Sequence, residues 1–333
     1  MRRAVYNQLM ITVQTCENQI EWDENVLSRK GHPLQLWGWG EVKAGHGWRV
    51  DRVVVREDTT VIGLGQLLIR PLPWPFTALA YIPRGPISEP GYEAEILTAL
   101  AHHAKYIHKA LVLTIEPDVE KLPHLSGWRQ SRNTVLIPRT LILDLLRSED
   151  ELLGDMTKKT RQYIRKSAQD VAVRKVKSRE ELAQCLEIYK QTATRAQFAL
   201  HDDQYYYDIF DKLGEHSPVF AAFVDDTPVA FLWLVISRQT AFELYGGMND
   251  EGQRLRANYT LKWHVIQAMK TWGIERYDLN GLLNDGVSTF KQGFAAHENM
   301  LVGTYDKPLS SLYSIWNTAL PLAKKALRVI KNR

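Results

Sequence analysis

Cysteine is scarce in this chain of 333 residues, which contains only Cys16 and Cys185. The two residues lie far apart, and neither belongs to a C-x-x-C pattern or stands in a histidine-rich stretch. The sequence therefore predicts neither a disulfide framework nor a zinc site of clustered cysteine ligands. Because free thiols are usual in a reducing compartment, we expect a cytoplasmic protein.

Long hydrophobic runs are missing as well. The longest apolar run, residues 229–236, is far shorter than the ~20 residues that a membrane-spanning helix needs. The chain starts with Arg2 and Arg3 like a secretion signal, but Asn7 and Gln8 interrupt any apolar stretch. We therefore expect a mature sequence that does not span a membrane.

A strong excess of one charge is also absent, since 42 Lys and Arg residues face 38 Asp and Glu residues. With 45% hydrophobic and 24% charged residues, the composition is that of a globular protein and excludes disordered and collagen-like chains. The tail, residues 307–333, is an exception because it contains six basic and no acidic side chains. It suits peripheral contact with an anionic membrane surface, although its apolar residues also suit docking on the first half of the protein.

The hydrophobic pattern repeats once along the chain. In the first half it predicts three strands, a helix and a further strand, at residues 48–56, 60–70, 77–82, 90–109 and 110–115. In the second half the same order is predicted at residues 218–224, 228–237, 240–246, 257–272 and 276–279. We interpret this as a duplicated domain of α/β (α+β) class. The division into one domain at 1–147 plus 309–333 and another at 148–308 is what the family resemblance given below implies, since it completes the first domain with the C-terminal tail.

An antiparallel meander followed by a helix and a splayed strand is the layout of the N-acetyltransferase (GNAT) type of acyltransferase fold. In that fold, the pyrophosphate of coenzyme A binds backbone N–H groups at a helix N-terminus behind a loop of small residues. The equivalent stretch is 253–258, where Arg256 and Asn258 stand in place of the small residues that a close approach needs. The sequence therefore argues against coenzyme A as the acyl donor, and no other cofactor is expected.

Five stretches, taken in order, resemble one protein family. They are residues 36–43 (LWGWGEVK), 81–86 (YIPRGP), 159–166 (KTRQYIRK), 277–281 (YDLNG) and 290–294 (FKQGF). Together they resemble the Fem family (FemX, FemA and FemB type) of peptidoglycan bridge-forming, tRNA-dependent aminoacyltransferases. Because residues 195–218 leave no room for the long helical arm of FemA and FemB, the compact FemX type is closer.

The resemblance implies an enzyme that transfers glycine, alanine or serine from aminoacyl-tRNA to the stem-peptide amine of a peptidoglycan precursor. The acceptor would be lipid II or UDP-MurNAc-pentapeptide, and DNA is not an expected partner. Two other functions stay open at this point. One is a coenzyme A-dependent N-acyltransferase on another amine, and the other is a non-catalytic protein that binds tRNA or a membrane surface.

The resemblance also assigns roles to individual residues. It places Lys291 at the reacting centre as an electrostatic catalyst, Phe290 beside the substrate and Glu116 near the acceptor amine. It gives substrate-binding positions to Lys43, Trp39, His201, Tyr205 and Tyr245. His201 replaces an arginine of the family, which loses a bidentate contact with phosphate. Each residue also has an ordinary structural interpretation, such as a buried tyrosine, a solvated carboxylate or, for Lys291, a strand lysine between core phenylalanines.

Basic residues gather between positions 158 and 177, where eight Lys and Arg residues face Asp170 alone. This cluster predicts contact with the phosphates of tRNA or of another polyphosphate. The candidate tRNA- or phosphate-binding residues are Lys158, Lys159, Arg161, Arg165 and Lys166. A solvated helix face is the alternative.

Three histidines, His102, His103 and His108, lie on the predicted first-half helix. Adjacent positions of a helix face different ways, and no carboxylate stands nearby in the sequence at metal-ligand spacing. We therefore expect exposed polar side chains here and no metal site.

Overall fold

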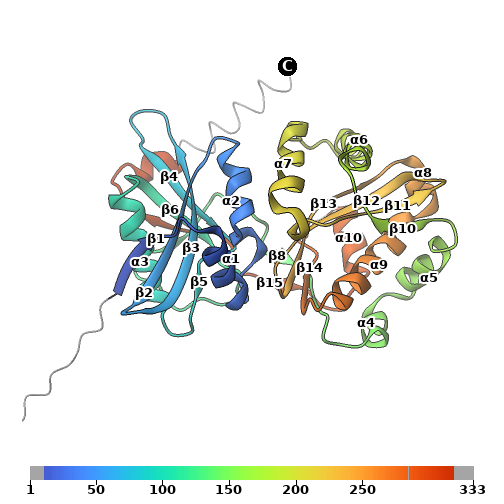
Figure 1. Ribbon diagram of the computed structural model, residues 1–333, viewed down its shortest axis with the longest axis horizontal. Coiled ribbons are helices and arrows are strands. Elements are labelled where there is room, and N and C mark those ends of the chain that lie inside the picture. Colours follow the sequence, from blue (N-terminus) through green and yellow to red (C-terminus); the bar gives the residue numbers. More distant parts are fainter. Residues whose placement is uncertain (1–10, 284, 319–333) are drawn as a thin grey trace, which may run out of the picture. The chain divides into compact units, whose positions relative to one another are not determined.

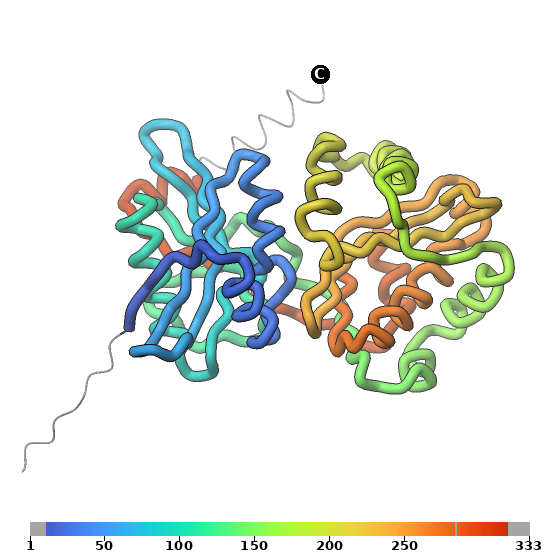
Figure 2. The backbone as a smooth tube through the Cα atoms, in the orientation of Figure 1, coloured from blue at the N-terminus to red at the C-terminus, as the bar shows by residue number. Residues whose placement is uncertain are grey.

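The computed structural model describes residues 11–283 and 285–318. Contacts divide the chain into two compact units, Met1–Arg29 with Lys43–Leu136 and Val302–Arg333, and Lys30–Val42 with Ile137–Leu301. This division differs from the predicted domain boundaries because of strand pairing. β9 (Ile142–Asp144) joins the sheet of the second unit, and β16 (Tyr305–Pro308) joins that of the first, as the late part of the tube in Figure 2 shows.

The first unit is built on an eight-stranded sheet in the order β1-β2-β3-β4-β6-β16-β7, with β5 paired to β3. Its further strands are β1 (Ile11–Thr15), β2 (Arg49–Glu57), β3 (Thr60–Pro71), β4 (Ala78–Pro83), β5 (Ile87–Ser88), β6 (Ala110–Glu116) and β7 (Arg129–Gln130). Its helices are α1 (Gln19–Ser28) and α3 (Glu93–Tyr106). η1 (Pro33–Gln35) and the first part of α2 (Trp37–Ala44) belong to the second unit.

Helix α3 lies against the sheet of the first unit (Figure 1). Its apolar stripe, which includes Ile96 and Leu100, packs on buried side chains of β2, β3, β4 and β6. Gly63 on β3 makes this contact possible, because a Cβ atom at that position would lie 2.6 Å from Cδ1 of Ile96. The predicted order of three strands, a helix and a strand is confirmed in this unit.

The second unit contains a six-stranded sheet in the order β10-β11-β12-β13-β14-β9. Its further strands are β10 (Ala172–Lys175), β11 (Val219–Val224), β12 (Thr227–Ile236), β13 (Thr240–Met248) and β14 (Arg276–Asp278), with β8 (Arg139–Thr140) and β15 (Asn299–Met300) pairing separately. Its helices are α4 (Glu149–Asp155), α5 (Lys158–Ser167), α6 (Arg179–Ala196), α7 (Asp203–Leu213), η2 (Gly214–His216), α8 (Asp250–Leu255), α9 (Ala257–Thr271) and α10 (Gly286–Gln292).

The sheet of the second unit is covered on both faces, with α6 on one side and α9 on the other (Figure 1). Alternate residues of β12 therefore enter different cores. Leu232 and Leu234 pack in the hydrophobic cluster that includes residues of α9. Trp233 points to the other face, where its ring centroid lies 6.4 Å from that of Tyr206 on α7. The predicted three strands, helix and final strand are again confirmed.

β13 and β14 separate after a short parallel pairing. Only residues 240–242 pair with residues 276–278, after which β14 ends and β13 continues to Met248. β13 thus extends past the end of β14, and beyond the last pair the Asn280 side-chain amide, and not a strand, contacts the Glu243 carbonyl oxygen.

Two stretches fold differently from the interpretations considered for the sequence. The interpretation of Lys291 as a strand residue is wrong, because Lys291 lies on helix α10. Asp285 caps the start of this helix, where its side chain accepts a hydrogen bond from the backbone N–H of Ser288. The basic stretch 158–177 is one helix only as far as Ser167 and then becomes β10.

In the part of the chain that the structure describes, no helix is long and apolar enough to cross a membrane. Most of the basic tail, residues 319–333, lies outside the described residues. Its contact with a membrane surface or with the first unit therefore stays a prediction.

Candidate active site

Lys291 is held near the point where β13 and β14 separate. Its Nζ atom donates hydrogen bonds to the backbone carbonyl oxygens of Asn280 and Gly281, at 3.0 and 3.2 Å. Burial lowers the pKa of Lys291 to about 8, because the ammonium loses hydration. The result is a partly buried positive charge in a fixed position.

A buried ion pair lies within electrostatic reach of Lys291. Nζ of Lys262, on α9, donates to both carboxylate oxygens of Glu243, on β13, at 2.5 and 2.6 Å. The phenol of Tyr277, on β14, donates to the same carboxylate at 2.8 Å. Glu243 raises the pKa of Lys291 and Lys262 lowers it, although burial has the larger effect. Lys262, Glu243 and Tyr277 thus connect α9, β13 and β14 near the candidate catalytic lysine.

The turn that presents carbonyl oxygens to Lys291 is itself held by hydrogen bonds. The fully buried carboxylate of Asp278 accepts from the Thr140 hydroxyl at 2.5 Å and from the Asn280 backbone N–H at 2.8 Å. Asn280 adopts a left-handed backbone conformation, with φ of 57°, and its side-chain amide donates to the Glu243 carbonyl oxygen at 3.0 Å. These contacts fix the position from which the Lys291 ammonium is held.

Phe290 and the end of α10 connect Lys291 to the basic helix α5. The Phe290 ring lies edge-on to Tyr259, with centroids 4.9 Å apart. One residue beyond α10, the Gly293 carbonyl oxygen accepts a hydrogen bond from the Thr157 N–H at 3.0 Å, and Thr157 is the N-cap of α5. A Cβ atom at Gly293 would collide with the Thr160 hydroxyl oxygen. Helix α5 therefore begins directly beside the helix that carries Lys291.

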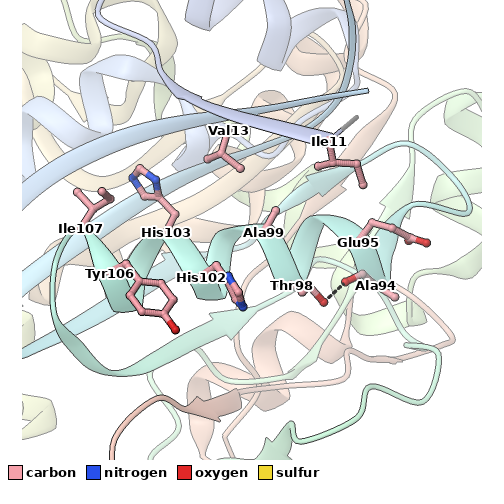
Figure 3. Close-up of a pocket in the computed structure, with 10 residues that line it drawn as sticks. All are labelled: Ile11, Val13, Ala94, Glu95, Thr98, Ala99, His102, His103, Tyr106 and Ile107. Carbon is pink, nitrogen blue, oxygen red and sulfur yellow. Dashed lines mark hydrogen bonds between the residues drawn. The ribbon is translucent and has the colours of Figure 1, made fainter. Parts of the chain in front are cut away.

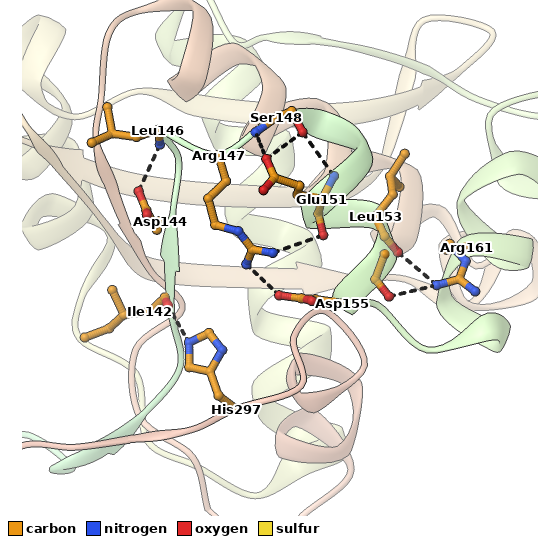
Figure 4. Close-up of polar contacts among 11 residues, drawn as sticks. Ile142, Asp144, Leu146, Arg147, Ser148, Glu151, Leu153, Asp155, Arg161 and His297 are labelled. Atoms are coloured by element: carbon orange, nitrogen blue, oxygen red, sulfur yellow. Dashed lines mark hydrogen bonds and ion pairs between the residues drawn. The ribbon is translucent and has the colours of Figure 1, made fainter.

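The exposed face of α5 carries the remaining candidate anion-binding residues. Lys158, Lys159, Arg165 and Lys166 are exposed, and none of the four forms an ion pair within residues 11–283 and 285–318. Arg161 differs, because its guanidinium donates to the Leu153 carbonyl oxygen at 2.9 Å, at the end of α4 (Figure 4). It also donates to the Met156 carbonyl oxygen at 2.5 Å. Arg161 thus stabilises the α4–α5 connection.

The expectation that the basic stretch 158–177 faces few acids is wrong for its last part. Arg174 forms an ion pair with Glu181 at 2.7 Å, and Lys175 forms one with Glu215 at 2.5 Å. Both acids come from segments that follow in the sequence and reach β10 only in the fold. The uncompensated charge therefore lies mainly on α5, and Lys177 is the other basic residue of the stretch without an ion pair among the described residues.

The candidate acceptor-binding residues of the second unit form an aromatic cluster. The His201 ring stacks on Tyr205 with centroids 4.0 Å apart, and Tyr205 and Tyr245 share a side-chain hydrogen bond. Tyr206 and Tyr189 lie edge-on or tilted around Tyr245, at 5.3 and 5.4 Å. Burial raises the pKa of Tyr205 to about 12, so its phenol stays protonated and can donate a hydrogen bond. The structure thus brings His201, Tyr205 and Tyr245 together.

Glu116 ends β6 in the first unit and is buried, with 1% of its surface exposed. It accepts hydrogen bonds from the Tyr81 phenol, from the Thr304 hydroxyl at 2.6 Å, and from the backbone N–H groups of Val135 and Leu136 at 3.0 and 2.9 Å. Because four donors already contact the carboxylate, its contacts favour holding the surrounding chain over taking a proton.

Lys43 and Trp39 both lie on α2. Trp39 is buried, whereas Lys43 is half-buried in the last turn of the helix. Burial lowers the pKa of Lys43 to about 8. The ammonium is therefore close to its titration range near neutral pH, unlike that of an ordinary surface lysine.

The interpretation of the three histidines as side chains without a carboxylate partner is wrong for two of them. Nε2 of His103 and Nε2 of His108 each lie 2.6 Å from Oδ2 of Asp51. Asp51 belongs to β2, so the carboxylate comes from a distant part of the sequence. His102 is exposed, as expected.

Sequence reasoning missed the Lys262, Glu243 and Tyr277 cluster. The available signal was Glu243, the one charged residue of the β13 sequence, and Lys262, which stands between Leu261 and Trp263 on the apolar face of α9. Buried charges of opposite sign are normally paired, so two such positions in neighbouring elements predict a contact.

Comparisons with known proteins cover both units. Residues 21–134 match the FemAB family, and residues 154–292 match an acetyltransferase (GNAT) domain. The chain is 30% identical over 279 residues to a lipid II:glycine glycyltransferase of Staphylococcus aureus (strain USA300), which covers 77% of this chain and 62% of that protein. It is 31% identical over 208 residues to a protein of the same name from Staphylococcus haemolyticus (strain JCSC1435), covering 56% and 49%. The chain thus spans about half to three fifths of the length of these curated relatives.

The fold also has a counterpart among solved structures. The crystal structure of FemX superimposes with a TM-score of 0.82 at 22% sequence identity, and the match covers 92% of this chain and 100% of that chain. This likeness, together with the GNAT match, confirms the predicted pair of GNAT-like domains. In the stretch where a long helical arm was excluded, the chain forms the loop before α7, α7 itself and η2.

Proposed function

Because the chain belongs to the FemAB family, we propose that it is an aminoacyltransferase of peptidoglycan bridge formation. Its donor is aminoacyl-tRNA and its acceptor is the stem-peptide amine of lipid II. The relatives are named for glycyl transfer to lipid II, which makes glycine and lipid II the first substrates to test. Alanine, serine and the acceptor UDP-MurNAc-pentapeptide are the alternatives.

The observation that carries the proposal is the position of Lys291. A partly buried ammonium is held by two carbonyl oxygens, next to a buried Lys262–Glu243 pair and end-to-end with an uncompensated basic helix. A fixed positive charge in a desolvated place stabilises a developing oxyanion better than water does. The basic helix supplies the phosphate contacts that an RNA-linked substrate needs.

The reaction requires little covalent chemistry from the protein. The neutral acceptor amine attacks the carbonyl carbon of the aminoacyl ester, and a C–N bond forms. The C–O bond to the tRNA ribose then breaks, its electron pair goes to the ribose oxygen, and that oxygen takes up a proton. Lys291 stabilises the negative oxygen of the tetrahedral intermediate, and Phe290 packs beside the ester. The protonated Lys291 can also supply the proton to the ribose oxygen, and it then takes up the proton that the attacking nitrogen loses as the amide forms.

We assign the tRNA contact to Lys158, Lys159, Arg165 and Lys166 on α5. Arg161 supports this surface indirectly, because its contacts with Leu153 and Met156 position the helix. Such contacts add affinity without reading the base sequence. Helix α5 begins beside α10, so a tRNA bound along α5 has its aminoacylated end near Lys291.

The acceptor-binding residues are Tyr205, Tyr245 and His201 in the second unit, and Lys43 and Trp39 on α2. Tyr205 can donate a hydrogen bond to a phosphate or peptide oxygen, and Lys43 supplies a charge for the diphosphate. His201 contributes a charge only when it is protonated, so its contact weakens as the pH rises. Glu116 acts as a positioning residue that holds Tyr81 and the backbone at Val135.

Lipid II is membrane-bound, so this proposal includes peripheral contact with the cytoplasmic face of the membrane. A coenzyme A donor fits the second unit poorly. Residues 253–258, the stretch equivalent to the pyrophosphate loop of the fold family, contain the last residues of helix α8 and the first residues of α9. Arg256 lies between the two helices, and its guanidinium lies 3.8 Å from the centroid of the Tyr163 ring. These groups occupy the approach to the N-terminus of α9.

Mass spectrometry of reaction products tests the proposal. The purified chain is incubated with glycyl-, alanyl- or seryl-tRNA and, in separate tubes, with lipid II or UDP-MurNAc-pentapeptide. We expect one aminoacyl addition to one precursor, which requires the tRNA and is lost in Lys291→Met. Acetyl addition from acetyl-CoA would replace the proposal with the coenzyme A alternative. tRNA binding without any product would favour a binding protein.

A further inference from the structure

A histidine–aspartate–histidine cluster lies in the first unit, outside the proposed active site. Oδ2 of Asp51 lies 2.6 Å from Nε2 of both His103 and His108, and the three ligand atoms are all within 4.8 Å of one another. The side chains are only 8%, 12% and 15% exposed. Three potential ligand atoms therefore converge in a largely desolvated place.

The elements that carry these residues hold them firmly. Asp51 lies on β2, His103 in the last turn of α3, and His108 in the short connection between α3 and β6. The second oxygen of Asp51, Oδ1, accepts a hydrogen bond from the Thr15 hydroxyl of β1 at 2.9 Å. Carboxylates that bind metals are commonly oriented by an outer hydrogen bond of this kind.

We propose that Asp51, His103 and His108 bind a divalent transition-metal ion, zinc in preference to the others, which ties β2 to the end of α3. Two imidazoles and one carboxylate are a ligand set for zinc and its neighbours, whereas magnesium and calcium prefer oxygen ligands. The three ligands leave a fourth tetrahedral position for water.

The present geometry needs only a small adjustment to hold the ion. Ligand atoms about 2.0–2.2 Å from zinc lie roughly 3.3 Å from one another in a tetrahedral site. The Asp51 oxygen and each imidazole nitrogen must therefore move apart by less than about 1 Å. The ion takes the place of the protons that lie between the carboxylate and the two Nε2 atoms, and each neutral ring then carries its one proton on Nδ1.

The cluster is accessible from solvent on one side. His103 lines a cavity of about 650 Å³ together with Ile11 and Val13 of β1 and with residues of α3. Figure 3 shows His103 on the side of α3 that faces β1, whereas His102 points away from it. An ion can thus enter beside His103 without unfolding of the unit.

The ion ties β2 to the end of α3 and takes no part in the proposed reaction. His108 precedes the first residue of β6 by two positions, whereas Glu116 is the last residue of that strand. A seven-residue strand is about 20 Å long at the usual rise per residue. Removal of the ion should therefore lower the melting temperature and leave aminoacyl transfer by the folded enzyme unchanged.

Metal titration of the full chain, purified without a histidine tag and stripped with a chelator, tests the proposal. We expect one equivalent of Zn²⁺ to bind and to raise the melting temperature, and Co²⁺ in its place to give the absorption bands of a four-coordinate site. Mg²⁺ and Ca²⁺ should have no effect. Asp51→Asn and His103→Gln should lose at least about tenfold in Zn²⁺ affinity, and Thr15→Val should lose a similar factor through its contact with Asp51.

His102→Gln is the matched control, because it removes a neighbouring histidine of the same helix and should leave binding unchanged. Equal Zn²⁺ affinity in His102→Gln and His103→Gln, or no binding by the wild type, would overturn the proposal and leave a hydrogen-bonded His–Asp–His cluster. If the ligand variants fail to fold, X-ray absorption of the zinc-bound wild type decides. A spectrum that shows two imidazole nitrogens and a carboxylate oxygen as the protein ligands of zinc would support the proposal, and any other set of protein ligands would overturn it.

Discussion

Lys262 and Glu243 form an ion pair in the interior of the second unit, with their side chains 4% and 6% exposed. One ammonium donates to both carboxylate oxygens, and Tyr277 donates to one of them. Replacing such a pair with apolar residues often costs a protein nothing, so its stability value alone does not explain its presence. Its electrostatic contact with Lys291 offers a reason, because Glu243 opposes the loss of the lysine proton.

Glu243→Gln should lower the free energy of unfolding by about 3 kcal/mol, because it leaves the charge of Lys262 buried without a counter-charge. Urea unfolding followed by circular dichroism measures this. Glu251→Gln is the control, since its pair with Arg254 is on the surface and should matter little. If Glu243→Gln and Glu251→Gln lower the free energy of unfolding by similar amounts, the buried charge of Lys262 does not need Glu243 as its counter-charge.

Lys291→Met should reduce kcat at least about 100-fold, the typical cost of removing one oxyanion-stabilising group. Lys270→Met is a matched control, because Lys270 also donates to two backbone carbonyl oxygens, those of Leu145 and Arg147, at 2.7 and 2.6 Å. Both variants should fold, and only Lys291→Met should lose single-turnover transfer from aminoacyl-tRNA. Comparable activity in the two would exclude a chemical role for Lys291.

The transfer rate should stop rising with pH at about 8. Burial lowers the pKa of Lys291 to about 8, so its catalytic ammonium is present below that pH and is lost above it. The acceptor amine acts in the opposite direction, because it must be neutral to attack and has a pKa near ~10.4 in water. Below pH 8 the fraction of neutral amine grows while Lys291 stays charged, so kcat/KM rises. Above pH 8 the loss of the Lys291 ammonium offsets this growth, so kcat/KM levels off and falls only above the pKa of the amine.

Glu243→Gln should move this levelling-off to lower pH, because the charge of Glu243 raises the pKa of Lys291. Lys43 also titrates near pH 8, since burial lowers its pKa as well. Lys43→Met distinguishes the two, as it should leave the levelling-off in place while raising KM for the acceptor. A profile that keeps rising through pH 8 in Lys43→Met would assign the titration to Lys43 instead.

The double substitution Lys158→Gln and Lys159→Gln should weaken tRNA binding and reduce the slope of log affinity against log salt by about 2. Lys190→Gln is the control, because Lys190 is already paired with Glu187 and Asp203 at 2.7 and 2.9 Å. Filter binding over a salt series gives both quantities. An unchanged slope in the double variant would move the tRNA contact away from α5.

Most of the fold could be predicted because the strands alternate or are fully apolar, and the helices carry clear stripes. Residues 49–57 and 257–271 form a strand and a helix within a residue or so of the expected bounds. The boundary between the units was harder to predict from the sequence. It depends on β9 and β16, short strands whose partners lie far away in the sequence.

The candidate site could be predicted only where a residue pattern carried the information. Lys291 and Phe290 stand in one recognisable stretch, whereas Lys262 and Glu243 stand in separate segments and meet only after folding. Asp51 escaped for the same reason, since β2 precedes its histidine partners by about fifty residues. The sequence shows which side chains are charged, but it does not show which of them pair, because paired residues from distant segments meet only when the sheet forms.

Gly293→Ala should impair transfer by displacing α5 relative to α10. Gly293 has an ordinary helical backbone, with φ of −67°, so alanine is excluded by contact and not by conformation. The added Cβ meets the Thr160 hydroxyl, which also lies 2.9 Å from the Thr157 hydroxyl at the start of α5. Thr160→Ala removes the obstructing oxygen, so Gly293→Ala with Thr160→Ala should recover activity that Gly293→Ala alone loses. Failure of the second substitution to restore single-turnover transfer would mean that the junction of α5 and α10 does not govern the position of Lys291.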